Sequence, residues 1–317
     1  MSAPTSQPAR FPYRVEIGVA LGAWLALFHW LGNSTFGYVA TPSLFGWLYP
    51  LYDANPDDGI GLLAPFVTIW MISQRRKELE SLTWNPWLPS LGWVVLGLLL
   101  HLAGYQVQQG RVSVLGMIVG LYGITGLYWG RDWLKLARFP FAMLLFCIPT
   151  SVYLAAVTFK LRLFVATVAT GFCTEILGMH ILRKGTEVYN VGPDGLPGFR
   201  FEVAAACSGI RSLTAVLLLV LVYGFLFFRS PIRRLILLLS APVLAVLGNI
   251  FRLITVFIVG ESLGQEAGAK IETGFGFVTF IGVAIGGTLL LGRWLKEKPE
   301  NPPSAPEPAA STASSPA

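Results

Sequence analysis

Charged residues are scarce in this chain of 317 residues. Asp, Glu, Lys and Arg make up 13% of the sequence, about half of the roughly 25% that is usual in soluble domains. Hydrophobic residues make up 54%, and the mean hydropathy is +0.62. This composition excludes a soluble enzyme, a disordered protein and a protein that reads nucleic-acid bases, so we expect no nucleic-acid partner.

Cysteine is also rare. The three cysteines, Cys147, Cys173 and Cys207, are too few and too widely spaced for a disulfide framework or a zinc site. We therefore expect neither a metal nor another cofactor, and at least one thiol must be free or bonded to another molecule. Cys147 and Cys173 lie within apolar runs and are expected to be structural.

Long apolar runs dominate the sequence instead. A membrane-spanning helix needs about 20 mostly apolar residues, and about eight runs of this kind can be marked off. The sequence therefore predicts an all-α multipass membrane protein whose single membrane domain extends over 15–298, with the first helix retained as an anchor. The predicted spans are 15–32, 59–74, 87–104, 112–130, 139–158, 212–228, 235–258 and 274–292.

Lys and Arg occur in clusters that determine the predicted topology. Short cytoplasmic loops collect these residues, and five clusters, separated by pairs of predicted spans, hold 14 of the 23 in the chain. With these clusters inside, the protein lies in the cytoplasmic (inner) membrane, both termini are cytoplasmic, and the acidic loop 33–58 is outside. The clusters are Arg10 and Arg14; Arg75, Arg76 and Lys77; Arg131, Lys135 and Arg138; Arg229, Arg233 and Arg234; and Arg293, Lys296 and Lys298.

Three segments lie outside the predicted spans. Residues 159–182 are apolar enough to cross, but a crossing would place the last two basic clusters outside, so we expect a helix that lies at the outer interface or dips into it. Residues 1–14 form a short cytoplasmic segment. Residues 299–317 contain six prolines among small residues, and we expect a disordered cytoplasmic tail.

A predicted hairpin leads to the most reactive thiol. Turn residues at 193–195 separate two strand-like segments, 186–191 and 199–203. Soon after them Cys207 directly precedes the sixth span on the outer side. Unpaired amides at a helix N-terminus lower the pKa of a thiol, and Arg211 adds to this effect. The alternative is that Cys207 is a small buried hydrophobic residue.

Polar residues in and after the seventh span indicate a site at the same face. A charge within a membrane helix is costly unless it is paired or faces a cavity. Arg252, with Asn249 one turn earlier, is therefore a candidate functional residue. The alternative is that its side chain extends to the outer lipid headgroups. A rise of about 1.5 Å per residue puts Arg252 near the outer face. The next loop brings Glu261, Glu266 and Glu272 outside, and Glu272 is best placed to reach a pocket, although a lone loop glutamate can simply be solvated.

Together these motifs resemble the exosortase/archaeosortase family of multipass membrane cysteine transpeptidases. The resemblance covers most of the chain, from about residue 45 to 295. It is most specific where ACSGIR is followed about 40 residues later by an arginine in an apolar helix. The segments that carry it are ACSGIRSL at 206–213, NIFR at 249–252 and GFGFVTF at 274–280, with weaker similarity at 57–79 and 139–150.

The resemblance implies a catalytic cysteine and arginine, which fall on Cys207 and Arg252. A third polar residue, histidine in exosortases, begins a His-x-x-x-Gly-x-x-x-Phe pattern that falls here on Glu272, Gly276 and Phe280. The carboxylate of Glu272 could orient Arg252 or accept a proton, or it could mark a divergent subfamily with altered activity. The expected supporting residues are Ser208, Gly209, Arg211 and Asn249. The histidines, His29, His101 and His180, fall elsewhere, and only His180, on the expected interfacial helix, could lie near the cysteine.

The same resemblance implies a reaction at the outer face of the membrane. Cys207 would cleave exported proteins at a C-terminal sorting signal, which consists of a short motif, a transmembrane helix and a basic tail. A thioester would form, Arg252 would stabilise the oxyanion or the thiolate, and a lipid or glycan acceptor could then release the protein.

Two other functions remain open. The protein could be a non-catalytic membrane partner in exopolysaccharide assembly or export, which would suit the missing histidine. It could also be a transporter in which Arg252 binds an anionic substrate. A transporter site should lie near the middle of the membrane and couple to acidic residues there, and only Glu16 and Glu175 are candidates.

Overall fold

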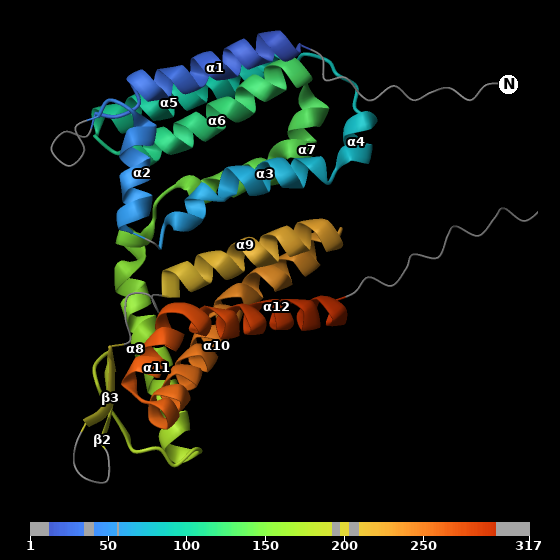
Figure 1. The fold of residues 1–317 in the computed structure, drawn as a ribbon. Helices are drawn as coiled ribbons and strands as arrows, with labels where there is room; N and C mark the ends of the chain where they lie inside the picture. The colour runs from blue at the N-terminus through green and yellow to red at the C-terminus, as the bar shows by residue number, and fades with distance from the viewer. Residues whose placement is uncertain (1–12, 35–40, 56, 192–196, 203–208, 296–317) are drawn as a thin grey trace, which may run out of the picture.

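The computed structural model describes residues 13–34, 41–55, 57–191, 197–202 and 209–295, which are mostly helical with one small sheet (Figure 1). Five helices in these ranges are long and apolar enough to cross a membrane. The mostly helical, multi-span architecture predicted from the sequence is therefore confirmed. The five helical segments are Leu88–Gln106, Gly110–Trp129, Ile210–Phe227, Pro231–Leu263 and Gly276–Trp294.

A first bundle consists of α1 (Arg14–Trp30), α5 (Leu91–Gln106) and α6 (Gly110–Trp129), which lie side by side (Figure 1). Glycines bring α5 and α6 together, because a Cβ added to Gly97 would lie 2.7 Å from the carbonyl oxygen of Gly116. Small residues at a helix contact allow this close approach of two backbones in a membrane.

Shorter elements connect this bundle to the rest of the protein. The predicted span 59–74 contains a 3₁₀ turn and the 10-residue helix α3, and the predicted span 15–32 contains the 17-residue helix α1. Both helices are shorter than the roughly 20 residues of a typical spanning helix. The connecting elements are α2 (Leu44–Ala54), the 3₁₀ turn Gly59–Leu62, α3 (Ala64–Ser73), α4 (Arg76–Glu80) and the 3₁₀ turn Leu88–Ser90.

The prediction of one spanning helix over 139–158 is wrong. Helix α7 (Arg131–Ala142) contains Pro140 and passes into the 3₁₀ turn Met143–Cys147, and the next helix, α8, begins only after Pro149. Proline lacks a backbone donor and disfavours helical geometry in the residue before it. Pro140 lies in the last turn of α7, and Pro149 lies in the break between the 3₁₀ turn and α8, so the predicted span is not one helix.

Helix α8 (Ser151–Glu175) runs across the direction of α9 and α12 instead of alongside them (Figure 1). The interfacial position expected for 159–182 stays a prediction. The helix begins earlier than expected, however, and residues 181–184 form a strand, so the predicted helix was too long at its end. Gly178, with a φ of 68°, lies between the two elements in the left-handed region that often follows a helix C-terminus.

The sheet has three antiparallel strands in the order β1-β2-β3. Strands β2 (Glu187–Val191) and β3 (Pro197–Glu202) form the predicted hairpin, whose turn at 193–195 lies outside the described residues. Strand β1 (Ile181–Lys184) pairs with β2 and was not predicted.

The second bundle is built around one very long helix. Helix α10 has 33 residues, which corresponds to about 50 Å of length and exceeds the roughly 30 Å of a hydrocarbon core. Its C-terminal part therefore extends beyond the neighbouring helices and carries the sheet. The elements of this bundle are α9 (Gly209–Phe227), α10 (Pro231–Leu263), α11 (Gln265–Lys270), a π-helical turn at Ile271–Phe275 and α12 (Gly276–Trp294).

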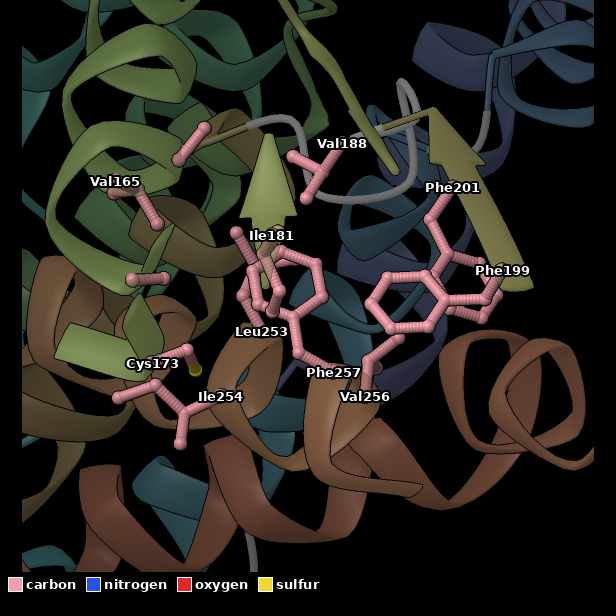
Figure 2. Close-up of a cluster of buried hydrophobic side chains, with 12 residues drawn as sticks. Val165, Cys173, Ile181, Val188, Phe199, Phe201, Leu253, Ile254, Val256 and Phe257 are labelled. Carbon is pink, nitrogen blue, oxygen red and sulfur yellow. The ribbon is translucent and has the colours of Figure 1, made fainter. Parts of the chain in front are cut away.

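An aromatic cluster attaches the sheet to α10. Phe199 and Phe201 of β3 lie against α10 (Figure 2). The ring of Phe199 stacks on that of Phe257, with 6.2 Å between the ring centroids. Cys173 of α8 is fully buried in the same cluster. The sheet, α8 and the C-terminal part of α10 thus form one packed unit beside α9.

Candidate functional site

Two polar side chains of α10, Asn249 and Arg252, form the centre of the candidate site. They lie about one turn apart, and only 2% and 7% of their surfaces are exposed. Arg252 is thus enclosed by the protein and does not extend to the surface. A buried guanidinium needs hydrogen-bond partners, because desolvation of a charge is expensive.

Asn249 joins α10 to the start of α9. The hydroxyl of Ser212 donates a hydrogen bond of 3.0 Å to Oδ1 of Asn249, and both residues are buried. The Nδ2 atom of Asn249 is buried with no hydrogen-bond partner within the part of the chain that the structure describes. An unmade hydrogen bond of this kind costs about 1–3 kcal/mol. This amide is therefore a donor that a bound group could use.

The start of α12 encloses Arg252. The Nη2 atom of Arg252 donates a 2.7 Å hydrogen bond to the backbone carbonyl of Glu272, in the π-helical turn. A Cβ added to Gly276 would lie 3.1 Å from Nε of Arg252 and 2.8 Å from the carbonyl oxygen of Ile271. Glycine at position 276 therefore lets the guanidinium lie directly against the backbone of α12.

The spacing of residues 272, 276 and 280 has a packing explanation. One helical turn after Gly276, the ring of Phe280 covers Gly248, where an added Cβ would lie 2.6 Å from Cδ2 of the ring. The pattern therefore marks the face of the last helix that packs on α10 around Arg252. The backbone carbonyl of Glu272 accepts this hydrogen bond from Arg252, so the bond does not depend on which side chain position 272 carries.

Two acidic residues that precede α3 support the site from the first half of the chain. Oδ1 of Asp57 lies 3.9 Å from Nε of Arg211, one turn into α9. Oδ1 of the buried Asp58 accepts hydrogen bonds from the backbone amides of Thr150 (2.9 Å) and Ser151 (3.1 Å), and its Oδ2 accepts one from the Ser151 hydroxyl. Asp57 and Asp58 thus hold the starts of α9 and α8. The sequence had indicated only that they lie outside, and the similarity at 57–79 was the signal for their importance.

Cys207 and Ser208 lie outside the described residues. Gly209, two positions after Cys207, is the first residue of α9. Cys173 is buried, and burial raises the pKa of its thiol to about 11. It is therefore a protonated structural thiol near neutral pH, while Cys147, half-buried, directs its Sγ to the carbonyl of Gly61 at 3.4 Å.

The other candidate acids and histidines lie apart from Arg252. The carboxylate of Glu261 accepts a hydrogen bond from Asn190 of β2, and the exposed Glu266 pairs with Lys270 at 3.1 Å. Nδ1 of His29 lies 3.1 Å from the Ser43 hydroxyl, in the first half of the chain. His101 is buried against Phe28 in the first bundle, and His180 is exposed beside β1. The described ranges hold no group of three His, Cys, Asp or Glu that could bind a metal ion.

Comparison with known families covers most of the chain. Residues 52–290 match the family model described as transmembrane exosortase (Exosortase_EpsH). No curated protein and no solved structure gives a match. The matched region includes the acidic pair, the start of α9, the polar residues of α10 and the start of α12.

Proposed function

The chain belongs to the transmembrane exosortase family and is a multipass membrane protein, and from this premise we propose that it is a cysteine transpeptidase. Its substrates are exported proteins that carry a C-terminal sorting signal, with a motif, a transmembrane helix and a basic tail. The observation that supports this proposal most is the burial of Arg252 and Asn249 on α10, where Asn249 bonds Ser212 near the start of α9. Cys207 precedes that start by two residues.

The proposed reaction begins with the thiolate of Cys207. It attacks the carbonyl carbon of the scissile peptide, and the negative charge that develops on the carbonyl oxygen needs donors fixed in advance. Arg252 supplies a guanidinium that is held by the Glu272 carbonyl, and the Nδ2 amide of Asn249 supplies a second donor. Collapse of the intermediate breaks the C–N bond, and the leaving amine takes up a proton and remains with the membrane anchor.

The second half-reaction releases the protein from the enzyme. The amine or hydroxyl of an acceptor, which we propose to be a lipid or glycan, attacks the thioester carbonyl, loses its proton and expels the Cys207 thiolate. Glu272 is half-buried beside Arg252, and in this proposal its carboxylate accepts and returns the proton in place of the family's histidine. Ser208, Gly209 and Arg211 position the nucleophile at the start of α9.

The proposed orientation places this site outside the cytoplasmic membrane and both termini in the cytoplasm. The start of α1 and the ends of α3, α6, α9 and α12 lie at one end of the molecule, and the start of α9 lies at the other (Figure 1). Basic clusters adjoin the former end, which the positive-inside rule assigns to the cytoplasm.

The test is the processing of a tagged sorting-signal protein in cells. With Cys207→Ala we expect processing to be lost while the protein still accumulates in the membrane. Cys173→Ala is the matched control, because Cys173 is a buried thiol among apolar side chains of the sheet cluster, and it should process normally. Unaltered processing with Cys207→Ala would overturn the proposal.

A second candidate function is that of a non-catalytic partner in exopolysaccharide assembly or export. The observation that favours it is Glu272 at the position of the family's histidine. In that case Cys207→Ala would leave exopolysaccharide export intact, whereas Asn249→Ala, which removes the buried amide donor, would reduce it.

A further inference from the structure

The second bundle packs, along a seam, against the elements that connect it to the first bundle. Helix α3 and the end of α7 lie on one side of this seam and α9 on the other (Figure 1). Met71, Met143 and Phe225 form its small buried core. Two cavities lie along the same seam, and they differ in chemistry.

The first cavity is basic and lies at the end of α9 opposite to Arg252. Its volume is about 640 Å³. Among its lining residues Glu78 is the single acid, against five basic residues. The basic residues are Arg75, Lys135, Arg138, Arg229 and Arg234.

Two of these guanidinium groups converge on one aromatic ring. The Cζ atoms of Arg75 and Arg234 lie 4.2 Å and 5.9 Å from the ring centroid of Phe225, and Phe139 stacks on the same ring at 4.9 Å. Glu78 bonds to Arg75 at 2.7 Å. The positive-inside rule explains why Lys and Arg occur at this end of the helices. Arg234 also donates two hydrogen bonds to the Phe228 carbonyl, and Lys135 pairs with Asp132 at 2.7 Å. The rule does not explain why five basic side chains line one cavity with a single acid, because like charges repel.

The second cavity is apolar and adjoins the first. Its volume is about 450 Å³, and Phe139 lines both cavities. Leu213, Leu217 and Leu221 of α9 line one wall, and Met143 lines the other, with Asp57 and Asp58 at the far end near the candidate site. From Leu221 to Leu213 the helix rises about 12 Å, close to the roughly 15 Å of one membrane leaflet.

We propose that a phosphate-bearing membrane lipid occupies this seam, with its headgroup in the basic cavity and a hydrocarbon chain in the apolar one. Guanidinium groups bind phosphate oxygens in a fork geometry, and basic pockets between membrane helices bind anionic headgroups. A free anion or an acidic peptide would use the basic cavity and leave the apolar one unfilled. The headgroup site is at the far end of α9 from Arg252, so the proposal does not rest on the proposed function.

Native mass spectrometry of the full-length protein in detergent tests the proposal. The probes are phosphatidic acid, a diacylglycerol with the same chains, and inorganic phosphate. We expect phosphatidic acid to remain bound, the diacylglycerol to bind at least tenfold more weakly, and inorganic phosphate to compete only at much higher concentration. Equal binding of inorganic phosphate and phosphatidic acid would mean a free-anion site, and equal binding of the diacylglycerol would mean a purely apolar groove; either result overturns the proposal.

Substitutions separate the two parts of the site. Arg75→Gln and the exposed Arg138→Gln should each weaken binding of phosphatidic acid about tenfold, because each removes one charge-assisted contact. Arg76→Gln is the matched control, because Arg76 is 77% exposed, pairs with Glu80 and does not line the cavity. Leu217→Trp should weaken lipid binding but leave inorganic phosphate binding unchanged. Binding that is unchanged in both Arg75→Gln and Arg138→Gln, or reduced equally in Arg76→Gln, contradicts the proposal.

Discussion

The two bundles use glycine for different purposes. In the first bundle, a Cβ on Gly97 would meet backbone atoms of α6, 2.7 Å from the Gly116 oxygen and 2.8 Å from the Gly120 nitrogen. In the second bundle, a Cβ on Gly276 would meet the carbonyl oxygen of Ile271 in the preceding turn at 2.8 Å and the side chain of Arg252 at 3.1 Å. Glycine thus brings two helices together in one bundle and fits a charged side chain against a backbone in the other. Equivalent substitutions should therefore reduce stability in the first bundle and activity in the second.

The largest effect is expected at Arg252. Arg252→Gln removes the charge that stabilises the proposed oxyanion, and loss of one such donor typically lowers the rate about 100- to 1,000-fold. The rate of substrate processing, followed in a pulse-chase experiment and normalised to the amount of enzyme in the membrane, measures this effect. Arg183→Gln on β1 is the control, because that exposed arginine donates its hydrogen bond to the nearby backbone carbonyl of Gly185 and has no role in the proposed reaction. Normal processing by Arg252→Gln would mean that the buried arginine is structural.

The next effect is on the stability of the first bundle. Gly97→Ala pushes α5 and α6 apart, and overpacking of this kind costs about 1–3 kcal/mol. Gly92→Ala in the same helix has no atom within 4 Å of the added Cβ, so it should be neutral or slightly stabilising because alanine favours helix. Unfolding in detergent, followed by circular dichroism, measures the difference. Equal stability of the two variants would contradict the close contact of α5 and α6.

A smaller effect on activity is expected at Gly276. Gly276→Ala should shift the π-helical turn and the guanidinium that it holds by a few tenths of an ångström. We expect the processing rate to fall about tenfold, because misplacement of a catalytic group by 1 Å can cost about 100-fold. Gly282→Ala, in the same helix with no atom within 4 Å of the added Cβ, is the control. If Gly276→Ala lowers stability as much as Gly97→Ala does and leaves activity intact, the contrast between the bundles fails.

Local patterns in the sequence predicted the parts of the fold that depend on neighbouring residues. The apolar runs predicted the multipass architecture, and the turn residues at 193–195 predicted the hairpin of β2 and β3. The break within 139–158 could also have been predicted, since Pro140 and Pro149 are present in the sequence. The prediction of one span there followed the apolar composition instead of the prolines. Strand β1 was missed because its pairing with β2 is a tertiary contact.

The candidate site was predictable only in part for a similar reason. Asn249 and Arg252 were found because polar residues are conspicuous in an apolar helix, and the structure buries both. The cap that Asp58 forms on α8 joins residues more than ninety positions apart, which no local pattern reveals. Position 272 was noticed for its carboxylate, whereas the bond that holds Arg252 comes from its backbone carbonyl. Side-chain identity gives no information about such a bond.

The smallest effect is expected at Cys173, the thiol that packs with the sheet. Burial raises the pKa of Cys173 to about 11, so the thiolate, which is the reactive form, is about a thousandth of the population at pH 8. In a Cys147→Ser, Cys207→Ser background, alkylation by iodoacetamide should therefore be slow near neutral pH and rise about tenfold per pH unit until the pH approaches 11. Cys173→Ala should leave the processing rate within about twofold of the wild type, since the side chain lies among apolar neighbours of α8, the sheet and α10 and acts as a small hydrophobic residue. Rapid alkylation at pH 7 would show that this end of α10 opens to solvent, and the sheet could then not serve as a rigid support for the start of α9.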